Sequence, residues 1–203
     1  TLTIRPATGV TAAVTATVTG GAVIKILGKY ITIDGSNNGT ATRDLTITNT
    51  SASTPNVVWI GSTGVTPITN VTIKNSILIN GVNTSTAVVV SDGAVLGTAG
   101  YFNNITIENN SIQKAYMGVY SIAFVAAGNG SGLNISSNDL TTTGVNAIRY
   151  VGIYVQGVDG ATVHNNTIAN FDGLSGEDDK GTWFATGTRN SNITQNKIFN
   201  LNY

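Results

Sequence analysis

The chain has 203 residues, of which 24 are glycine and 3 are proline, and it contains no cysteine. Its 10 basic residues balance 10 acidic ones without forming a basic run, which argues against nucleic acid as a partner because clustered Lys and Arg hold phosphates. The lack of cysteine excludes disulfides and zinc–thiolate sites, and no apolar run reaches the roughly 20 residues that a transmembrane helix needs.

Short strands are predicted from the first residue onward, because apolar and polar residues alternate with period two and Gly and Asn punctuate the segments. Strands are expected at residues 1–5, 22–27, 30–34, 45–48, 71–74, 105–108 and 192–194. Ile33 and Ile47 are only 14 residues apart, so residues 28–50 are expected to hold two different strands of one turn. Residues 1–27 fit the later pattern poorly, which predicts an N-terminal turn of their own.

One phrase returns six times: an apolar residue, two variable positions, a small polar residue, a variable position and an apolar residue. Four regular copies have Asn110, Asn138, Asn166 and Asn196 in the polar slot, and two looser copies have Ser76 and Thr50. The copies begin at Ile47, Ile73, Ile107, Ile135, Val163 and Ile193, with spacings of 26, 34, 28, 28 and 30 residues. Strand repeats of this length indicate a solenoid, in which each repeat closes its core by stacking on the next.

A further strand follows in each repeat and often opens on glycine, at residues 57–60, 87–90, 118–121, 152–155 and 181–184. This order of strand, polar turn, strand, loop and Gly-apolar-aromatic phrase resembles the right-handed parallel β-helix of the pectate-lyase-like superfamily. From Tyr30 onward, and above all over residues 30–49, the chain is similar to β-helices in large secreted bacterial surface proteins. The resemblance implies an all-β, right-handed parallel β-helix of about six turns, at a secreted or bacterial cell-surface location.

The ends of the repeat array leave two alternatives. The phrase that begins at Ile193 starts a turn that the sequence does not complete, and the open strand edges of a solenoid invite pairing. No capping helix is expected at either end. We therefore expect residues 1–203 to be one β-helix domain that is part of a longer protein; the alternative is that residues 1–20 form a cap.

The recurring positions are expected to be structural. The flanking apolar residues are predicted to stack inward in two columns: Ile73, Ile107, Ile135, Val163 and Ile193, then Leu78, Ile112, Leu140, Ile168 and Ile198. Asparagine tolerates a left-handed backbone at the sharp turn between them, and its amide can bond the turns above and below. We therefore predict one internal ladder of Asn110, Asn138, Asn166 and Asn196 along the rod.

Few side chains have the pattern that catalysis requires. His164 is the single histidine and is interpreted as a surface or satisfied residue. Glycoside hydrolases need paired carboxylates, and only Glu177, Asp178 and Asp179 cluster, in a loop expected to be solvated or to bind calcium weakly. The Gly-His-Gly and Arg-x-Lys phrases of polygalacturonase-like β-helices are missing. We expect no catalytic residues, no metal site and no cofactor.

Aromatic residues recur at one outward position. The aligned Gly-apolar-aromatic phrases place Trp59, Val89, Tyr120, Tyr154 and Trp183 on successive turns. Adjacent turns are expected to put Arg149 beside Asp178 and Tyr150 beside Asp179, with Lys180 following. Such a stripe can hold a sugar chain by ring stacking and hydrogen bonds, whereas the alternative is cross-strand stabilisation worth roughly 0.2–1 kcal/mol per pair.

Two functions remain open from the sequence. We expect a non-enzymatic structural or adhesive module of a secreted or cell-surface bacterial protein, with glycans or neighbouring domains of the same chain as partners. The alternative is a carbohydrate-binding or polysaccharide-degrading β-helix that uses the aromatic stripe and its neighbouring charges: Trp59, Tyr120, Tyr154, Trp183, Arg149, Asp178, Asp179 and Lys180. The fold does not distinguish between these two functions, because the same scaffold is known to carry both.

Overall fold

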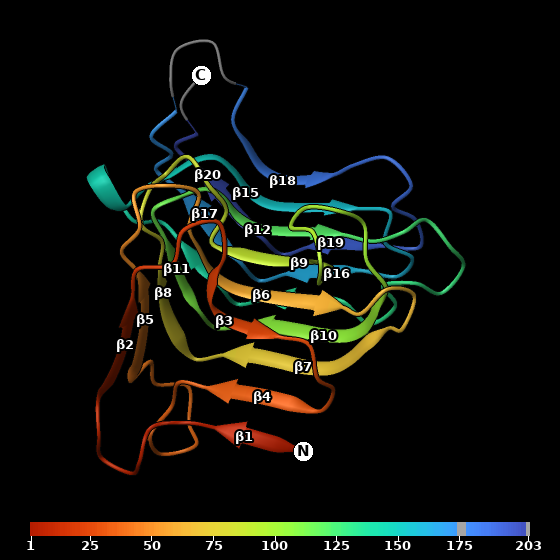
Figure 1. Ribbon diagram of the computed structural model, residues 1–203. Helices are drawn as coiled ribbons and strands as arrows, with labels where there is room; N and C mark the ends of the chain where they lie inside the picture. The colour runs from red at the N-terminus through yellow and green to blue at the C-terminus, as the bar shows by residue number, and fades with distance from the viewer. Residues whose placement is uncertain (174–177, 202–203) are drawn as a thin grey trace.

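The computed structural model describes residues 1–173 and 178–201, in which the chain winds as a parallel β-solenoid (Figure 1). Three parallel sheets run along the rod, and each turn adds one strand to each sheet in chain order. Stacking turns of this kind lie about 4.8 Å apart. The prediction of an all-β parallel solenoid of about six turns is confirmed. Within the described residues, the helical structure is a short 3-10 segment, Gly144–Asn146, and no helix is long and apolar enough to cross a membrane.

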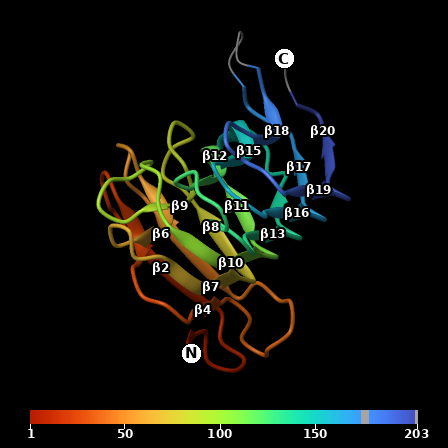
Figure 2. The same cartoon turned by 90° about the vertical axis from the view of Figure 1, so that its right-hand side faces the viewer.

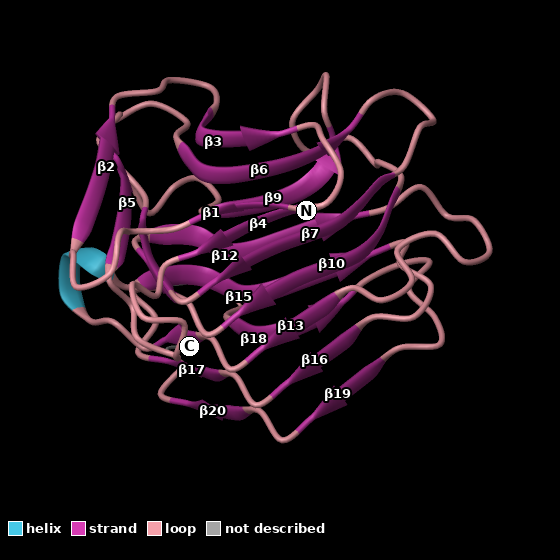
Figure 3. Ribbon diagram, turned by 90° about the horizontal axis from the view of Figure 1, so that it is seen from below, coloured by secondary structure: helices cyan, strands magenta, loops and turns pink. Residues whose placement is uncertain are grey.

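The strands of each sheet follow one another from the N-terminal to the C-terminal end of the rod (Figures 2 and 3). Sheet A consists of β1 (Leu2–Ile4), β4 (Ile31–Asp34), β7 (Ile68–Lys74), β10 (Phe102–Glu108), β13 (Asn134–Ser136), β16 (Thr162–His164) and β19 (Asn192–Thr194). Sheet B consists of β2 (Ala12–Ala16), β5 (Leu45–Asn49), β8 (Ser76–Ile79), β11 (Ser111–Gln113), β14 (Asp139–Leu140), β17 (Thr167–Ala169) and β20 (Lys197–Phe199). Sheet C consists of β3 (Ala22–Ile26), β6 (Asn56–Ser62), β9 (Val88–Asp92), β12 (Ala115–Ile122), β15 (Ile148–Gln156) and β18 (Lys180–Phe184).

The repeat phrase forms the corner between sheets A and B, and its apolar residues form the two predicted columns. Cross-strand pairs join Ile73 to Ile107 and Ile107 to Ile135 in sheet A, and the sheet B column pairs in the same way. Middle members such as Ile107 and Ile112 are fully buried. Towards the C-terminal end burial falls, and Ile193 and Ile198 are 46% and 41% exposed.

The copy of the phrase assigned to Ile47 and Thr50 is wrong. Ile47 pairs with Leu78 in sheet B, whereas the sheet A partner of Ile73 is Ile33. The residues between β4 and β5 form a long loop. In this turn the apolar residue of sheet A, Ile33, and that of sheet B, Ile47, are therefore separated by the loop instead of by the short corner of the phrase. The prediction that residues 28–50 hold two different strands is therefore confirmed, as is the separate first turn formed by β1, β2 and β3.

Asparagine side chains form the expected ladder inside the A–B corner. Each Oδ1 accepts a hydrogen bond from the backbone N–H of the slot residue one turn earlier, at 2.9–3.1 Å, beginning with Ser76 bonded to Asn110. Asn110, Asn138 and Asn166 also donate through Nδ2 to the next Oδ1 at 2.9–3.1 Å. These three residues are buried, while Asn196 at the C-terminal end of the ladder is half-buried.

The left-handed backbone expected at the ladder asparagines lies one residue earlier. Positive φ values of +57°, +49°, +57°, +55° and +56° occur at Asn75, Asn109, Ser137, Asn165 and Gln195. This residue bends the chain from sheet A into sheet B, so the residue that follows it points its amide inward. Two successive residues therefore share the roles that the sequence pattern assigned to one asparagine: the first has the left-handed backbone, and the second supplies the ladder amide.

Candidate functional site

The outer face of sheet C gathers most of the predicted site residues, and a repeated five-residue phrase produces this face. Tyr-x-Gly-x-Tyr occurs at 116–120 on β12 and at 150–154 on β15. The glycines leave no room for a side chain: a Cβ on Gly118 would lie 2.4 Å from Leu140 Cδ2, and one on Gly152 would lie 2.5 Å from Gly181 O and 2.7 Å from Ile168 Cγ2. Glycine lets sheet C approach the sheet B column closely while the tyrosines stand on the outside.

The predicted outward column exists in the predicted register. Trp59 pairs with Val89, Val89 with Tyr120, Tyr120 with Tyr154, and Tyr154 with Trp183. Its N-terminal half is covered, however: Trp59 is 5% exposed and Val89 is fully buried. The Trp59 indole Nε1 donates to Ser91 Oγ at 3.0 Å and to the carbonyl oxygen of Asp92 at 3.1 Å. Trp59 is therefore a structural residue rather than part of an open surface.

The C-terminal half of the column is partly exposed. Tyr120 and Tyr154 have ring centroids 5.1 Å apart and ring planes inclined by 24°. This is an offset stack, because two rings lying side by side in one plane could not bring their centres so close. Trp183 lies 5.0 Å from Tyr154 but is turned by 80°. The stacked tyrosines turn their faces to each other along the rod, whereas the Trp183 ring lies across that arrangement.

A second aromatic column flanks the first and was not among the predicted site residues. Tyr116 and Tyr150 stack with centroids 4.8 Å apart and planes inclined by 21°. Both rings are partly exposed, so five aromatic side chains from three turns form one surface. The sequence signal that could have found Tyr116 is the repeated Tyr-x-Gly-x-Tyr phrase, in which the first tyrosine takes the same place on each turn.

Cationic side chains lie over these rings. Lys180 pairs with Val151 across the strands, and its Nζ lies 5.1 Å from the Tyr150 ring centre and 4.9 Å from that of Trp183. The Arg149 guanidinium lies 5.5 Å from the Tyr116 ring. These are cation–π distances, and they bring the predicted Arg149 and Lys180 into the aromatic surface.

The acidic residues of the predicted site lie at its C-terminal border. Asp178 is exposed, and its carbonyl oxygen accepts a hydrogen bond from Lys180 Nζ. The Asp179 carboxylate lies against Gly173, since a Cβ on that glycine would lie 2.5 Å from Asp179 Oδ2. Glu177, the third member of the predicted acidic cluster, lies outside the described residues. Across the described ranges, no group of three or more His, Asp or Glu side chains is placed to hold a metal ion.

Two tyrosine hydroxyls on this surface, those of Tyr120 and Tyr154, are neutral hydrogen-bonding groups. Desolvation, and to a smaller degree a neighbouring tyrosine, raises the pKa of both Tyr120 and Tyr154 above the ordinary value. Both hydroxyls therefore stay protonated at neutral pH and can donate or accept hydrogen bonds. Tyr154 uses its hydroxyl to donate to Gln156 Oε1 at 2.5 Å.

His164 does not belong to this surface. It lies on β16 of sheet A, where its Nδ1 is 3.0 Å from Asn165 Nδ2 and its strand pairs with β13 and β19. The aromatic surface lies on sheet C. The interpretation of His164 as a satisfied residue therefore agrees with its position.

Comparison of the chain with protein-family models, with curated proteins and with solved structures finds no match. The fold is therefore assigned from the strand pairing alone, and the proposed function rests on the residues of the aromatic surface.

Proposed function

We propose that this chain is a non-enzymatic adhesive module of a secreted or cell-surface bacterial protein, and that it holds a glycan on the outer face of sheet C. The proposal includes membership of the pectate-lyase-like β-helices, which the parallel solenoid supports at the level of fold. The observation that carries it is the surface of five partly exposed aromatic rings on β12, β15 and β18. Aromatic faces with nearby polar groups suit sugar rings, whose C–H groups stack and whose hydroxyls need partners.

Trp183 is the central contact in this proposal. Each stacked tyrosine covers one ring face of its partner, and Arg149 and Lys180 lie over Tyr116 and Tyr150, so the tyrosines offer mainly ring edges and hydroxyls to a ligand. Trp183 is turned by 80° from Tyr154 and is not part of that parallel stack. Lys180 Nζ lies over the Trp183 ring, 4.9 Å from its centre, and can donate to sugar hydroxyls or to a carboxylate at the edge of that ring. The surface is open and buries little of a ligand, so binding is expected to be weak.

The test is titration with oligomers of β-1,4-glucan, chitin, xylan and polygalacturonate, followed by calorimetry and tryptophan fluorescence. The chain has two tryptophans, and Trp59 is buried, so ligand-induced fluorescence changes report on Trp183. Trp183→Ala should weaken binding by about tenfold, or ~1.4 kcal/mol. Phe124→Ala is the matched control, because Phe124 is 51% exposed and stacks on Tyr101 outside this surface.

Two results would contradict the proposal. Equal binding by wild type and Trp183→Ala would show that the glycan does not bind to this surface. Release of new reducing ends or unsaturated products from the same oligomers would favour a polysaccharide-degrading β-helix instead.

A purely structural rod is the second candidate, and the ring stacking favours it. Tyr116 stacks on Tyr150 and Tyr120 on Tyr154, so both pairs tie adjacent turns together on the outside of the rod. Such pairs contribute roughly 0.5–1.5 kcal/mol each beyond area burial. If no oligomer of the panel binds, the surface serves to stiffen the solenoid and the module acts as a stalk.

A further inference from the structure

A cavity lies away from the aromatic surface, at the corner between sheets A and B. The loop between β4 and β5 arches over this corner, and a cavity of about 370 Å³ lies beneath it. Its lining comes from the loop, from the ends of β7 and β10, and from the left-handed corner residues: Thr40, Ala41, Lys74, Asn75, Glu108, Asn109 and Ser137. Ligand pockets commonly have about 300–1,000 Å³, so this volume suits a small molecule.

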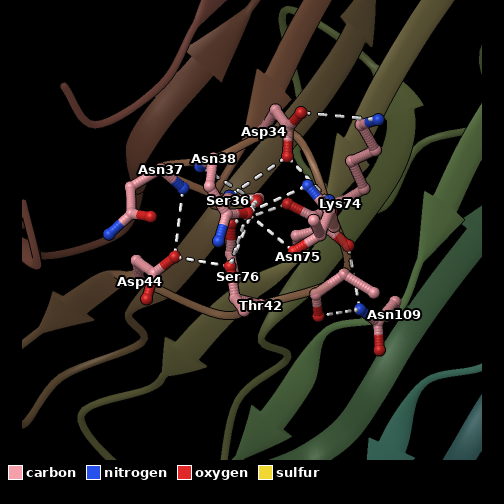
Figure 4. A network of polar contacts seen from close by, with 12 residues as sticks. Asp34, Ser36, Asn37, Asn38, Thr42, Asp44, Lys74, Asn75, Ser76 and Asn109 are labelled. Carbon is pink, nitrogen blue, oxygen red and sulfur yellow. Dashed lines mark hydrogen bonds and ion pairs between the residues drawn. The ribbon is translucent and has the colours of Figure 1, made fainter. Parts of the chain in front are cut away.

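The loop is held in place by its own hydrogen bonds. Asp34 Oδ1 accepts from Ser36 N–H at 3.1 Å, and Asp44 Oδ2 accepts from Asn37 N–H at 3.0 Å and from Thr42 Oγ1 at 2.6 Å. Figure 4 shows these residues meeting beside Lys74 and Asn75. A loop that is ordered before binding loses little entropy when a ligand enters.

The same loop is also tied to the rod beneath it. Asn75 Nδ2 donates to the carbonyl oxygen of Thr40 at 3.2 Å, and Asn109 Nδ2 donates to that of Ala41 at 2.8 Å. Arg43 Nε donates to the carbonyl oxygen of Asn109 at 2.9 Å, and the Arg43 guanidinium lies 3.7 Å from Asp139. The loop is therefore anchored to the corners of several turns.

Several polar groups of the cavity remain available. The Glu108 carboxylate makes no hydrogen bond or ion pair with any residue that the structure describes, although Glu108 pairs with Lys74 across the strands. Lys74 Nζ lies 3.4 Å from Asp34 Oδ2, and an ammonium has three donors, so some of them are spare. The Ser137 hydroxyl is exposed at the rim.

The charges around the cavity select the ligand. Lys74 is compensated by Asp34, and Arg43 by Asp139, which leaves the Glu108 carboxylate as an uncompensated negative charge. A ligand carboxylate would meet this charge with repulsion, whereas an ammonium group would pair with it. The spare Lys74 donors and the Ser137 hydroxyl suit sugar hydroxyls.

We propose that the cavity beneath the 35–44 loop is a binding site for an amino sugar, whose ammonium pairs with Glu108 and whose hydroxyls bond Lys74 and Ser137. This site is independent of the glycan surface on sheet C.

The test is a titration of the isotopically labelled protein with D-glucosamine, D-glucose and D-glucuronate, followed by amide chemical shifts. Glucosamine should shift the amides of 40–43 and 108–110, glucose should bind more weakly, and glucuronate most weakly. Glu108→Gln keeps the shape of the side chain and should weaken glucosamine binding by about tenfold, while the exposed Asp172→Asn should leave it unchanged.

Three outcomes would overturn the proposal: no shifts in these segments up to the solubility limit of glucosamine, equal shifts with all three sugars, or unchanged binding in Glu108→Gln. The amide spectrum of Glu108→Gln without ligand shows whether the variant is folded. Trp183→Ala should keep glucosamine binding, which separates this site from the proposed glycan surface.

Discussion

Asn138 shows how one side chain connects neighbouring turns of the rod. Its Nδ2 donates to the carbonyl oxygen of Ile107 at 2.8 Å and to Asn166 Oδ1 at 3.0 Å, and its own Oδ1 accepts from the backbone and side chain of Asn110. All these groups are buried, so each needs a partner inside the protein. The side-chain amide of Asn138 is therefore hydrogen-bonded to both the preceding and the following turn.

Replacing Asn138 by leucine is therefore expected to lower the free energy of unfolding by about 1–3 kcal/mol, because the buried amide of Asn110 and the Ile107 carbonyl lose their partners. Urea unfolding followed by circular dichroism measures the change. Asn134→Leu is the matched control, since Asn134 lies on the same turn and is partly exposed. A loss as small as that of the control would show that the ladder contributes little.

At the scale of the elements, Asp159 links three loops at the edge of sheet C. Its carboxylate accepts from Gly128 N–H at 2.7 Å and from Asn190 Nδ2 at 2.6 Å, and it lies 3.2 Å from the Arg189 guanidinium. The hydrogen bond from Gly128 is the largest cause that lowers the pKa of Asp159, and Asn190 is the next. The loops before β13, β16 and β19 are thus connected through one ionised group.

The lowered pKa of Asp159 predicts the sign of a pH effect. A carboxylate with a depressed folded pKa stabilises the protein above its ordinary pKa of 3.8, and this contribution is lost as the pH falls through the folded pKa. Asp159→Asn should therefore destabilise the protein at pH near 7 and differ less from wild type at pH near 3. Urea midpoints at both pH values measure this, with Asp172→Asn as the control. A difference that stays constant with pH would contradict the prediction.

On the scale of the whole molecule, the rod is stabilised by repetition rather than by one central core. Each turn contacts its neighbours through three parallel sheets, so a turn in the middle has partners on both sides. Burial follows this order: β7 and β10 each contain three buried residues, whereas every residue of β1 and β20 is exposed.

Amide hydrogen exchange should therefore be slowest in β7 and β10 and fastest in β1 and β20, because opening a terminal turn breaks contacts on one side only. Mass spectrometry of peptic fragments after timed exchange measures this gradient. Uniform protection along the rod would mean that the turns open together as one cooperative unit.

The repeat, the inward columns, the position of the asparagine ladder and the register of the outward aromatic column could all be predicted from the sequence. These features are periodic, so spacing alone specifies which residues of successive turns lie side by side. The exception is the turn with Ile47, where the loop between β4 and β5 interrupts the period and the phrase was assigned to the wrong strand.

Which parts of these columns reach the surface could not be predicted from the spacing and depends on how the loops fold over the rod. Trp59 and Tyr120 occupy equivalent places in the repeat, yet Trp59 is buried and bonded to Ser91, while Tyr120 is partly exposed. Arg43 contacts Asn109, which is 66 residues away in sequence, and so helps to close the cavity under its loop. Loop paths and the reach of long side chains follow no period, which is why spacing could not predict them.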